Sequence, residues 1–260
     1  RADGILTVQD MGRPGHLAEG LSRGGAMDRR ALLEAAALLG AKTPLAAIEM
    51  AAAGGTFTAA TPTRIALTGA PMRAMLDGNR IAWSASHLLR TGSRLAIGPA
   101  ETGNYGYLSV GGGLASPDRL GSRSAHLAAG VGGLVGTGTV LPVGPDPGRA
   151  VGLTLPAEPR FAGGTIRIVP SLQTHLFDAA DLARFEATVF RRDLRSNRMG
   201  VRLTSSDAGF ATQGGLSVLS EVIVPGDIQI TGDGTPYVLV AECQTIGGYP
   251  RIGTVLPCDL

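Results

Sequence analysis

The C-terminal stretch, residues 225–260, constrains the fold more than any other part of the chain. Residues 227–231 alternate polar and apolar side chains, which is the two-residue period of a half-buried β-strand. Residues 232–236 (GDGTP) supply turn chemistry, because glycine accepts a positive φ and proline fixes its own. Residues 237–241 are a short apolar run typical of a buried strand, and residues 251–256 predict a third strand. The stretch therefore predicts a β meander that carries polar side chains.

The register of this meander decides whether its polar side chains converge. If Thr231 lies opposite Tyr237, Gln229 points away from Glu242 and Gln244. A four-residue turn or a β-bulge places all three on one face, since a one-residue slip inverts every side chain. The two-residue period does not distinguish these arrangements.

The rest of the sequence predicts a protein that is mainly β with two helices. Thirty-nine glycines and sixteen prolines without a repeat period are typical of a turn-rich β protein. Residues 29–39 (RRALLEAAALL) are strong helix formers that follow Asp28 as an N-cap and end at Gly40. Residues 179–190 predict a second helix, which Asp178 opens. Strand-like runs occupy residues 5–8, 48–68, 81–110, 166–169 and 201–203.

A segment rich in proline and glycine divides the chain. Residues 141–159 carry five prolines and show no amphipathic period. We therefore expect an N-terminal β lobe with one helix over residues 1–145 and a linker over residues 146–163. A C-terminal β-barrel lobe is expected over residues 164–260.

Charge, hydropathy and cysteine content exclude several classes of function. The formal net charge of +2 is too small to favour nucleic acid or an anionic membrane as a partner. The sequence contains no run of 18 apolar residues, so no membrane span is expected, and it shows no signal-peptide pattern. Cys243 and Cys258 match neither a disulfide framework nor a metal site, so we expect thiols in a reducing cytoplasm.

Several catalytic motifs are incomplete. Residues 20–24 match the G-x-S-x-G string, but a loop rather than a strand precedes Ser22, so no nucleophile elbow is expected. Lys42, the single lysine, lacks the glycines of a P-loop and follows a helix, which excludes both a P-loop and a biotin carrier. The four histidines contain no i, i+4 pair, so no metal site is expected.

Arginine, carboxylate and amide side chains on glycine-containing loops form the remaining pattern. Arginine binds carboxylates and phosphates through two parallel hydrogen bonds, and loop N–H groups add to an anion site. The same residue types also set turns and cap helices, so each one alone is ambiguous. As a set they predict an anion or amide site, with Asp10, Arg13, Asp28, Arg123, Asn197, Arg198, Gln229, Asp233, Glu242 and Gln244 as candidates.

Five motifs in a fixed order resemble one protein family. They are TVQDMGRPG at 7–15, GAMD at 25–28, GSRS at 121–124, SNRMG at 196–200, and VPGDIQ through QTIGGYP at 224–250. Together they resemble the biotin-dependent carboxyltransferase family known as allophanate hydrolase subunit 2, over essentially the whole chain. This family includes KipA, the C subunit of bacterial 5-oxoprolinase, and the C-terminal half of the urea carboxylase carboxyltransferase domain.

The resemblance implies a fold and partners. It implies a two-lobed, cyclophilin-like β-barrel architecture with a few short helices. A subunit 1 (KipI-like) protein is the implied partner, joined in one branch by a third, lactam-hydrolase subunit. Because family members usually continue past the final Asp-Leu, it also implies a C-terminal lobe that is incomplete at residue 260.

The resemblance leaves three functions open. The favoured one is the C subunit of an ATP-dependent 5-oxoprolinase that opens the lactam of 5-oxoproline to glutamate, with ATP entering through the complex. The second is a carboxyltransferase that moves carboxylate from carboxybiotin on a separate carrier to urea or a related amide. The third is a KipA-like regulatory protein that binds and sequesters its partner.

The motifs also imply site residues. Catalytic roles are expected for Asp10, Arg13, Arg198 and Gln244. Substrate-binding roles are expected for Asp28, Ser122, Arg123, Asn197, Gln229, Asp233, Thr245, Gly247, Gly248 and Tyr249. In either enzymatic function, arginines and backbone N–H groups would hold a carboxylate and stabilise oxyanion character.

Overall fold

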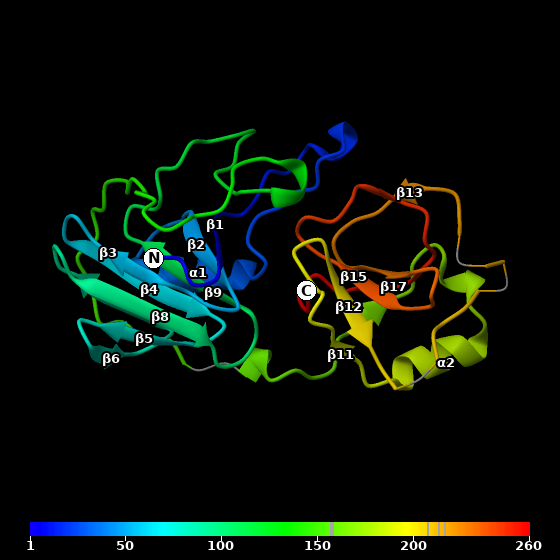
Figure 1. The fold of residues 1–260 in the computed structure, drawn as a ribbon. Helices are drawn as coiled ribbons and strands as arrows, with labels where there is room; N and C mark the ends of the chain where they lie inside the picture. Colours follow the sequence, from blue (N-terminus) through cyan, green and yellow to red (C-terminus); the bar gives the residue numbers. More distant parts are fainter. Residues whose placement is uncertain (157–158, 207, 213, 216) are drawn as a thin grey trace. The chain divides into compact units, whose positions relative to one another are not determined.

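The chain is described by a computed structural model over residues 1–156, 159–206, 208–212, 214–215 and 217–260. The described residues form two compact units, of which unit 1 comprises residues 1–13 and 24–164. Unit 2 comprises residues 14–23 and 165–260. Antiparallel strands dominate both units (Figure 1), which confirms the prediction of a mainly β fold.

The larger sheet of unit 1 contains five strands in the order β1, β2, β9, β4, β7. Their bounds are β1 Ile5–Gln9, β2 Ala47–Ala51, β9 Tyr105–Val110, β4 Thr63–Gly69 and β7 Ala85–Leu89. One face of this sheet supplies Leu6, Ile48, Ile65 and Leu108 to the hydrophobic core. Successive side chains of a strand point to opposite faces, so the residues between these positions face the other way.

A second sheet packs on the same core in the order β3, β8, β5, β6. Its bounds are β3 Thr56–Thr58, β8 Arg94–Ala100, β5 Met72–Leu76 and β6 Asn79–Ile81. Met72, Leu95 and Ile97 from this sheet belong to the core that contains Leu6. The core of unit 1 therefore lies between two sheets.

The opposite face of the five-stranded sheet packs against α1, Arg29–Leu39. Its buried residues recur with helical spacing and pack on Ala47, Ala66 and Tyr107 of the sheet. Asp28 Oδ1 accepts a hydrogen bond from Ala31 N at 3.0 Å, and Gly40 ends the helix with a φ of +66°. The predicted helix and both of its caps are confirmed.

The proline-rich segment that includes residues 146–163 belongs to unit 1. Thr154 bridges to Ala85, and the guanidinium of Arg64 donates to Asp146 through two hydrogen bonds of 2.7 and 2.8 Å. Unit 1 also contains two 3₁₀ turns, of which η2 Leu127–Ala129 precedes this segment and η3 Pro159–Phe161 lies near its end.

Unit 2 is built on a six-stranded sheet in the order β10, β17, β14, β15, β12, β11. The bounds are β10 Ile168–Val169, β17 Arg251–Val255, β14 Asp227–Ile230, β15 Pro236–Leu239, β12 Gly200–Thr204 and β11 Arg191–Arg192. A separate two-stranded ribbon pairs β13 Glu221–Val222 with β16 Ile246–Gly247. The core packs Ile228 and Ile230 against Phe177, Phe185 and Phe210.

The helix of unit 2, α2 Ala179–Ala187, begins where predicted and ends earlier. Asp178 caps it by accepting from Asp181 N at 2.7 Å. Thr188 is extended and residues 188–190 are not helical, so the prediction that the helix reaches residue 190 is wrong. The β-branched pair Thr188-Val189 explains the earlier end. Unit 2 also contains the 3₁₀ turns η1 Leu17–Glu19 and η4 Thr174–Leu176.

The register of the predicted meander places Gln229 opposite Tyr237 and Ile230 opposite Pro236. Gln229 therefore shares the face of Tyr237, as it does when Thr231 pairs with Tyr237. β15 ends at Leu239, so Glu242 and Gln244 lie in the following loop and not in the strand. A β-bulge does occur at Gln229, but it lies between β14 and β17.

Candidate functional site

Three motif-bearing loops of unit 1 pack against one another, namely residues 10–13, 24–28 and 119–126. Ala26 N donates to Asp10 O at 2.9 Å, which joins the first two loops. A Cβ on Gly25 would lie 2.7 Å from Gly12 N, and Gly25 has a φ of +86°. Glycine is therefore required at position 25 on both steric and conformational grounds.

Asp10 joins the first loop to the third. Its carboxylate accepts hydrogen bonds from Ser122 Oγ and Ser124 Oγ at 2.5 Å, from Arg123 N at 2.7 Å and from Gly12 N at 2.8 Å. Burial opposes ionisation, but these hydrogen bonds outweigh it and hold the pKa of Asp10 below its usual 3.8. An ionised carboxylate with four donors suits an anchor for the two loops better than a proton donor.

Arg13 is fully buried among the same loops. Its Nε donates to Arg119 O at 3.3 Å, and its Nη2 donates to Ser124 O. A Cβ on Gly24 would lie 3.5 Å from Nη1 of Arg13, so the second loop passes directly beside the guanidinium. Arginine stays charged when buried, so this position carries a fixed positive charge inside the loop cluster.

Asp28 ends the second loop and binds groups of unit 1 with both carboxylate oxygens. Oδ1 caps α1, and Oδ2 accepts from Arg160 Nη2 at 3.0 Å. Arg160 also binds Glu34 at 2.7 and 2.9 Å. The predicted binding residue Asp28 thus lies at the end of a loop that packs on the Asp10–Arg13 loop, while its carboxylate holds the helix start and Arg160.

Sequence reasoning missed Glu49 and Tyr107, which lie opposite each other on β2 and β9. Tyr107 Oη donates to Glu49 Oε2 at 2.7 Å, and Met27 N donates to the same oxygen at 2.8 Å. Burial raises the pKa of Tyr107 well above 10, so its hydroxyl stays protonated. The sequence did offer one sign of this site, namely a glutamate inside the otherwise apolar strand AIEMA. Ser124 was also missed, although it ends the GSRS motif.

In unit 2, the loops before β12 and after β15 meet through Arg198 and Glu242. Arg198 Nε donates to Glu242 Oε1 at 2.5 Å, and Glu242 N donates to Arg198 O at 2.7 Å. Both side chains are buried. Asn197 Oδ1 accepts from Met199 N at 2.8 Å and so shapes the turn that carries Arg198. The motif SNRMG therefore forms a tight loop around a buried ion pair.

The other predicted residues of unit 2 differ in accessibility. Gln229 is 6% exposed, and its Nε2 has no hydrogen-bond partner among the described residues. A Cβ on Gly247 would lie 2.4 Å from that nitrogen, so the Gly247 backbone packs on the amide. Thr245 is buried, whereas Gln244 and Tyr249 are exposed. Gly248, another predicted binding residue, accepts a hydrogen bond at its backbone O from Val218 N at 2.9 Å.

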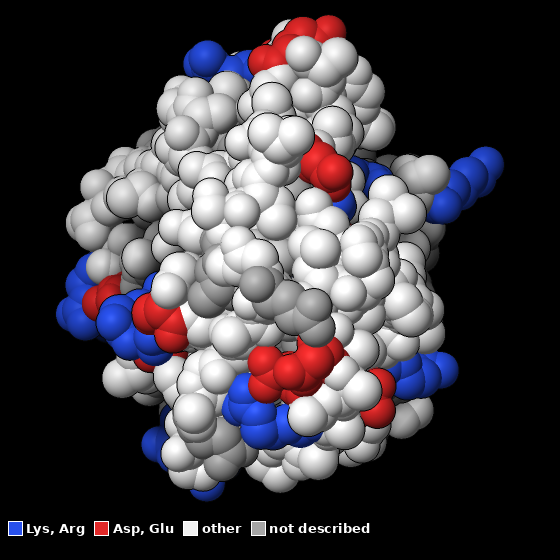
Figure 2. Space-filling view, turned by 90° about the vertical axis from the view of Figure 1, so that its right-hand side faces the viewer, with Lys and Arg blue, Asp and Glu red and all other residues white. Residues whose placement is uncertain are grey.

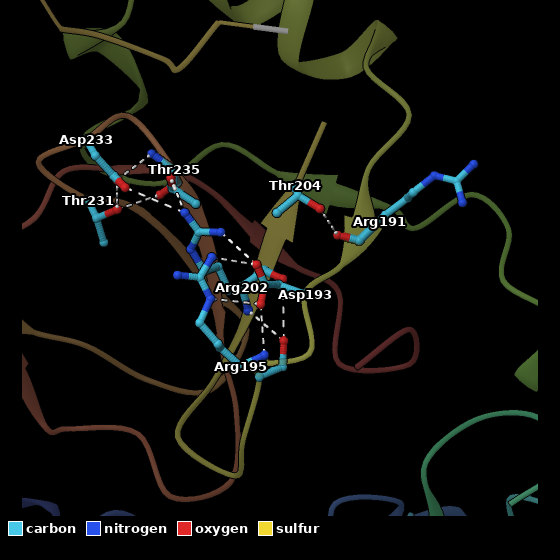
Figure 3. Close-up of polar contacts among 9 residues, drawn as sticks. Arg191, Asp193, Arg195, Arg202, Thr204, Thr231, Asp233 and Thr235 are labelled. Carbon is cyan, nitrogen blue, oxygen red and sulfur yellow. Dashed lines mark hydrogen bonds and ion pairs between the residues drawn. The ribbon is translucent and has the colours of Figure 1, made fainter. Parts of the chain in front are cut away.

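Asp233 lies in the β14–β15 turn, at the end of β15 opposite to Glu242. It accepts hydrogen bonds from Thr231 Oγ1 at 2.7 Å and Thr235 N at 3.1 Å, and the Thr231 bond contributes most to lowering the pKa of Asp233 to about 2. Figure 3 shows Arg202 between this turn and Asp193, to which it donates at 2.8 Å. Asp233 is therefore not brought together with the Arg198–Glu242 pair.

Charged side chains of both signs lie on the face drawn in Figure 2. On the face drawn in Figure 2, acidic and basic side chains of the described residues lie in adjacent groups separated by broad uncharged areas. Among the described residues, no three histidine, cysteine, aspartate or glutamate side chains gather as a metal site requires. The described helices include none that is long and apolar enough to span a membrane.

Comparison with known proteins gives consistent matches over most of the chain. A family model described as "carboxyltransferase domain, subdomain A and B" matches residues 19–260. The 5-oxoprolinase C subunit of Escherichia coli (strain K12) is 36% identical over 268 residues, covering 100% of this chain and 84% of that protein.

Two solved structures extend the likeness to three dimensions. The protein called TTHA0988 superposes with a TM-score of 0.89 at 30% identity, covering 98% of this chain and 50% of that chain. The urea carboxylase of Kluyveromyces lactis superposes with a TM-score of 0.84 at 26% identity, covering 99% of this chain and 25% of that chain. This chain thus spans half of the first protein and a quarter of the second.

Proposed function

The chain belongs to the family of the carboxyltransferase domain, subdomains A and B, and on this basis we propose that it acts as the C subunit of a 5-oxoprolinase. The observation that carries this proposal is the 36% identity to the E. coli protein of that name across the entire chain. In this function the chain helps to bind 5-oxoproline and to open its lactam to glutamate, at the expense of ATP.

The three-loop cluster of unit 1 is the part of the chain that we assign to the substrate. 5-Oxoproline carries one carboxylate beside one ring amide. The fixed charge of buried Arg13 would attract the substrate carboxylate, and N–H groups of the glycine-containing loops would stabilise oxyanion character at the amide carbonyl. Asp10 would keep the loops in place, because its carboxylate already accepts four hydrogen bonds.

The buried pair Arg198–Glu242 supports a second contribution from unit 2. The pair fixes the loop that precedes β12 against the loop that carries Gln244 and Thr245. Accessible Gln244 and Tyr249 then offer an amide and a phenol hydroxyl beside this fixed framework. We assign these side chains to partner contacts within the assembled enzyme.

The matched E. coli protein is named as one subunit of an enzyme, which indicates that it works with other subunits. We propose a KipI-like subunit 1 and a lactam-hydrolase subunit as the partners of this chain, with ATP used by the complex. The single lysine, Lys42, follows the C-terminal end of α1 and not a glycine-rich phosphate loop, so this chain alone is not the expected ATP site.

Glutamate release from 5-oxoproline and ATP tests this function. We expect turnover when the chain is combined with both companion subunits, and none from the chain alone or from the two companions alone. An assembled complex that releases no glutamate would overturn the proposal.

A second candidate is a carboxyltransferase that takes carboxylate from carboxybiotin on a separate carrier to urea or a related amide. The structural match to a urea carboxylase at 26% identity favours it. Incubating the assembled complex with a carboxybiotinylated carrier and urea distinguishes the two functions, because only the second predicts loss of carboxylate from the carrier that depends on urea.

A further inference from the structure

A buried pair of polar side chains supports the loop of residues 24–28 from the sheet beneath it. Glu49 and Tyr107 are directly opposite on neighbouring strands β2 and β9, and they are 1% and 0% exposed. Tyr107 Oη donates to Glu49 Oε2 at 2.7 Å. The loop completes the group, because Met27 N donates to Glu49 Oε2 and Asp28 N donates to Tyr107 Oη, each at 2.8 Å.

Placing these two side chains under α1 is costly unless their polar atoms are paired. A buried carboxylate or hydroxyl without a hydrogen bond loses its hydration without compensation. Here the phenol hydroxyl donates to the carboxylate and accepts from Asp28 N, so it acts as both donor and acceptor. These hydrogen bonds form together only when the loop holds Met27 and Asp28 in these positions.

The position of this loop is passed on to the Asp10–Arg13 loop. Ala26, one residue before Met27, donates its N–H to Asp10 O at 2.9 Å. Gly25 packs so closely on Gly12 that a Cβ would lie 2.7 Å from Gly12 N. A shift of Met27 and Asp28 therefore moves the backbone against which the Asp10–Arg13 loop rests.

We propose that Tyr107 and Glu49 are positioning residues that set the loop of residues 24–28 and, through it, the loop that carries Arg13. The kinetic part of this inference rests on the proposed function, in which Arg13 attracts the substrate carboxylate. The structural part concerns the loop alone and can be tested without turnover.

Tyr107→Phe is the direct variant, because it removes one hydroxyl and keeps the ring. Thr68→Val is a matched control from the same row of the sheet. Thr68 lies opposite Tyr107 on β4, is 0% exposed, and donates its hydroxyl to Ala31 O at 2.9 Å. Each variant removes one buried hydroxyl under α1, but the hydroxyl of Tyr107 binds the loop of residues 24–28 and that of Thr68 binds the helix.

Amide hydrogen exchange of the full chain gives the first measurement. We expect Tyr107→Phe to speed exchange of the Met27 and Asp28 amides about tenfold, the change that corresponds to losing ~1.4 kcal/mol of local stability. Thr68→Val should leave these two amides at the wild-type rate. Glu49→Gln should speed exchange of Met27 by a smaller factor, because a neutral acceptor binds an N–H less strongly than a carboxylate.

Steady-state glutamate release by the assembled complex gives the second measurement. We expect Tyr107→Phe to raise the KM for 5-oxoproline about tenfold with little change in kcat, and Thr68→Val to leave both within twofold. Equal exchange rates at Met27 and Asp28 in the wild type and Tyr107→Phe would overturn the inference, as would equal KM values in the two variants. A wild-type complex without turnover would refute the proposed function, while the exchange rates would still decide the role of the pair.

Discussion

At the level of single residues, three buried arginines differ in the groups to which they donate hydrogen bonds. Arg13 donates to the backbone carbonyls of Arg119 and Ser124 inside the loop cluster. Arg64 makes a bidentate pair with Asp146, and Arg198 is bonded to Glu242. A guanidinium stays charged when it is buried, and its planar fork suits the two parallel hydrogen bonds that Arg64 makes with Asp146.

The Arg198–Glu242 pair yields a prediction about stability. Arg198→Met leaves the Glu242 carboxylate buried without its cation, which should cost ~3–5 kcal/mol of unfolding free energy. Adding Glu242→Leu should recover part of this loss, since two apolar side chains leave no buried charge. Urea denaturation of the single and double variants measures both effects. A double variant no more stable than Arg198→Met would contradict this account of the pair.

Asp10 yields a prediction about pH. The pKa of Asp10 in the folded chain lies below its usual 3.8, so the ionised carboxylate stabilises the fold above that unfolded value. This stability disappears as the pH falls through the lower, folded-state pKa. Asp10→Asn should therefore be less stable than the wild type by ~1–3 kcal/mol at pH 7.

Thermal unfolding between pH 7 and pH 3 tests this pH dependence. The difference in melting temperature between Asp10→Asn and the wild type should become smaller as the pH falls below 3.8, the usual pKa of aspartate. Asp3→Asn, which changes an exposed carboxylate, is the control and should show a small gap throughout. If the difference in melting temperature for Asp10→Asn stays constant from pH 7 to pH 3, the role given to the hydrogen bonds of Asp10 is contradicted.

At the level of elements, local sequence predicted what local interactions determine. Residues 29–39 combine helix formers with an N-cap aspartate and a C-cap glycine, and the structure confirms all three. The meander of unit 2 was predicted as three strands, and β14, β15 and β17 occupy the expected places. The predicted end of α2 was three residues too late, because the β-branched pair Thr188-Val189 outweighed the helical pattern that continues to Phe190.

The sequence did not predict contacts that depend on how strands distant in the sequence pair with one another. Gln229 faces Tyr237 because of the turn geometry, and the two-residue period alone left that open. Asp233 and Glu242 are close in sequence, yet they lie at opposite ends of β15. Glu49 and Tyr107 form a pair only because β2 and β9 are neighbours, 58 residues apart in sequence.

The packing of the motif loops yields a prediction about glycine. Gly25 and Gly40 both have left-handed φ values, +86° and +66°, but a Cβ on Gly40 meets nothing within 4 Å. Gly40→Ala should therefore cost only the ~1–2 kcal/mol of the left-handed conformation. Gly25→Ala should cost several times more, because its Cβ would lie 2.7 Å from Gly12 N. Calorimetric melting of the two variants checks this, and equal melting temperatures would contradict the close packing of the two loops.

At the level of the whole molecule, the motifs and the structure lead to the same family. The predicted mainly β architecture is confirmed, and the solved relatives superpose with TM-scores of 0.89 and 0.84. The chain covers 84% of the E. coli relative and half of TTHA0988.

Kinetics of the reconstituted complex with two matched arginine variants test the central claim, that the loop cluster around Arg13 serves the 5-oxoprolinase reaction. Arg13→Lys keeps the charge but loses the planar fork, and we expect kcat/KM for 5-oxoproline to fall about a hundredfold, or ~2.7 kcal/mol. Arg64→Lys alters another buried arginine of unit 1 that is bonded to Asp146, and kcat/KM should stay within about twofold of the wild type. If Arg13→Lys retains the activity of Arg64→Lys in an assembled, folded complex, the loop cluster is not the site of this reaction.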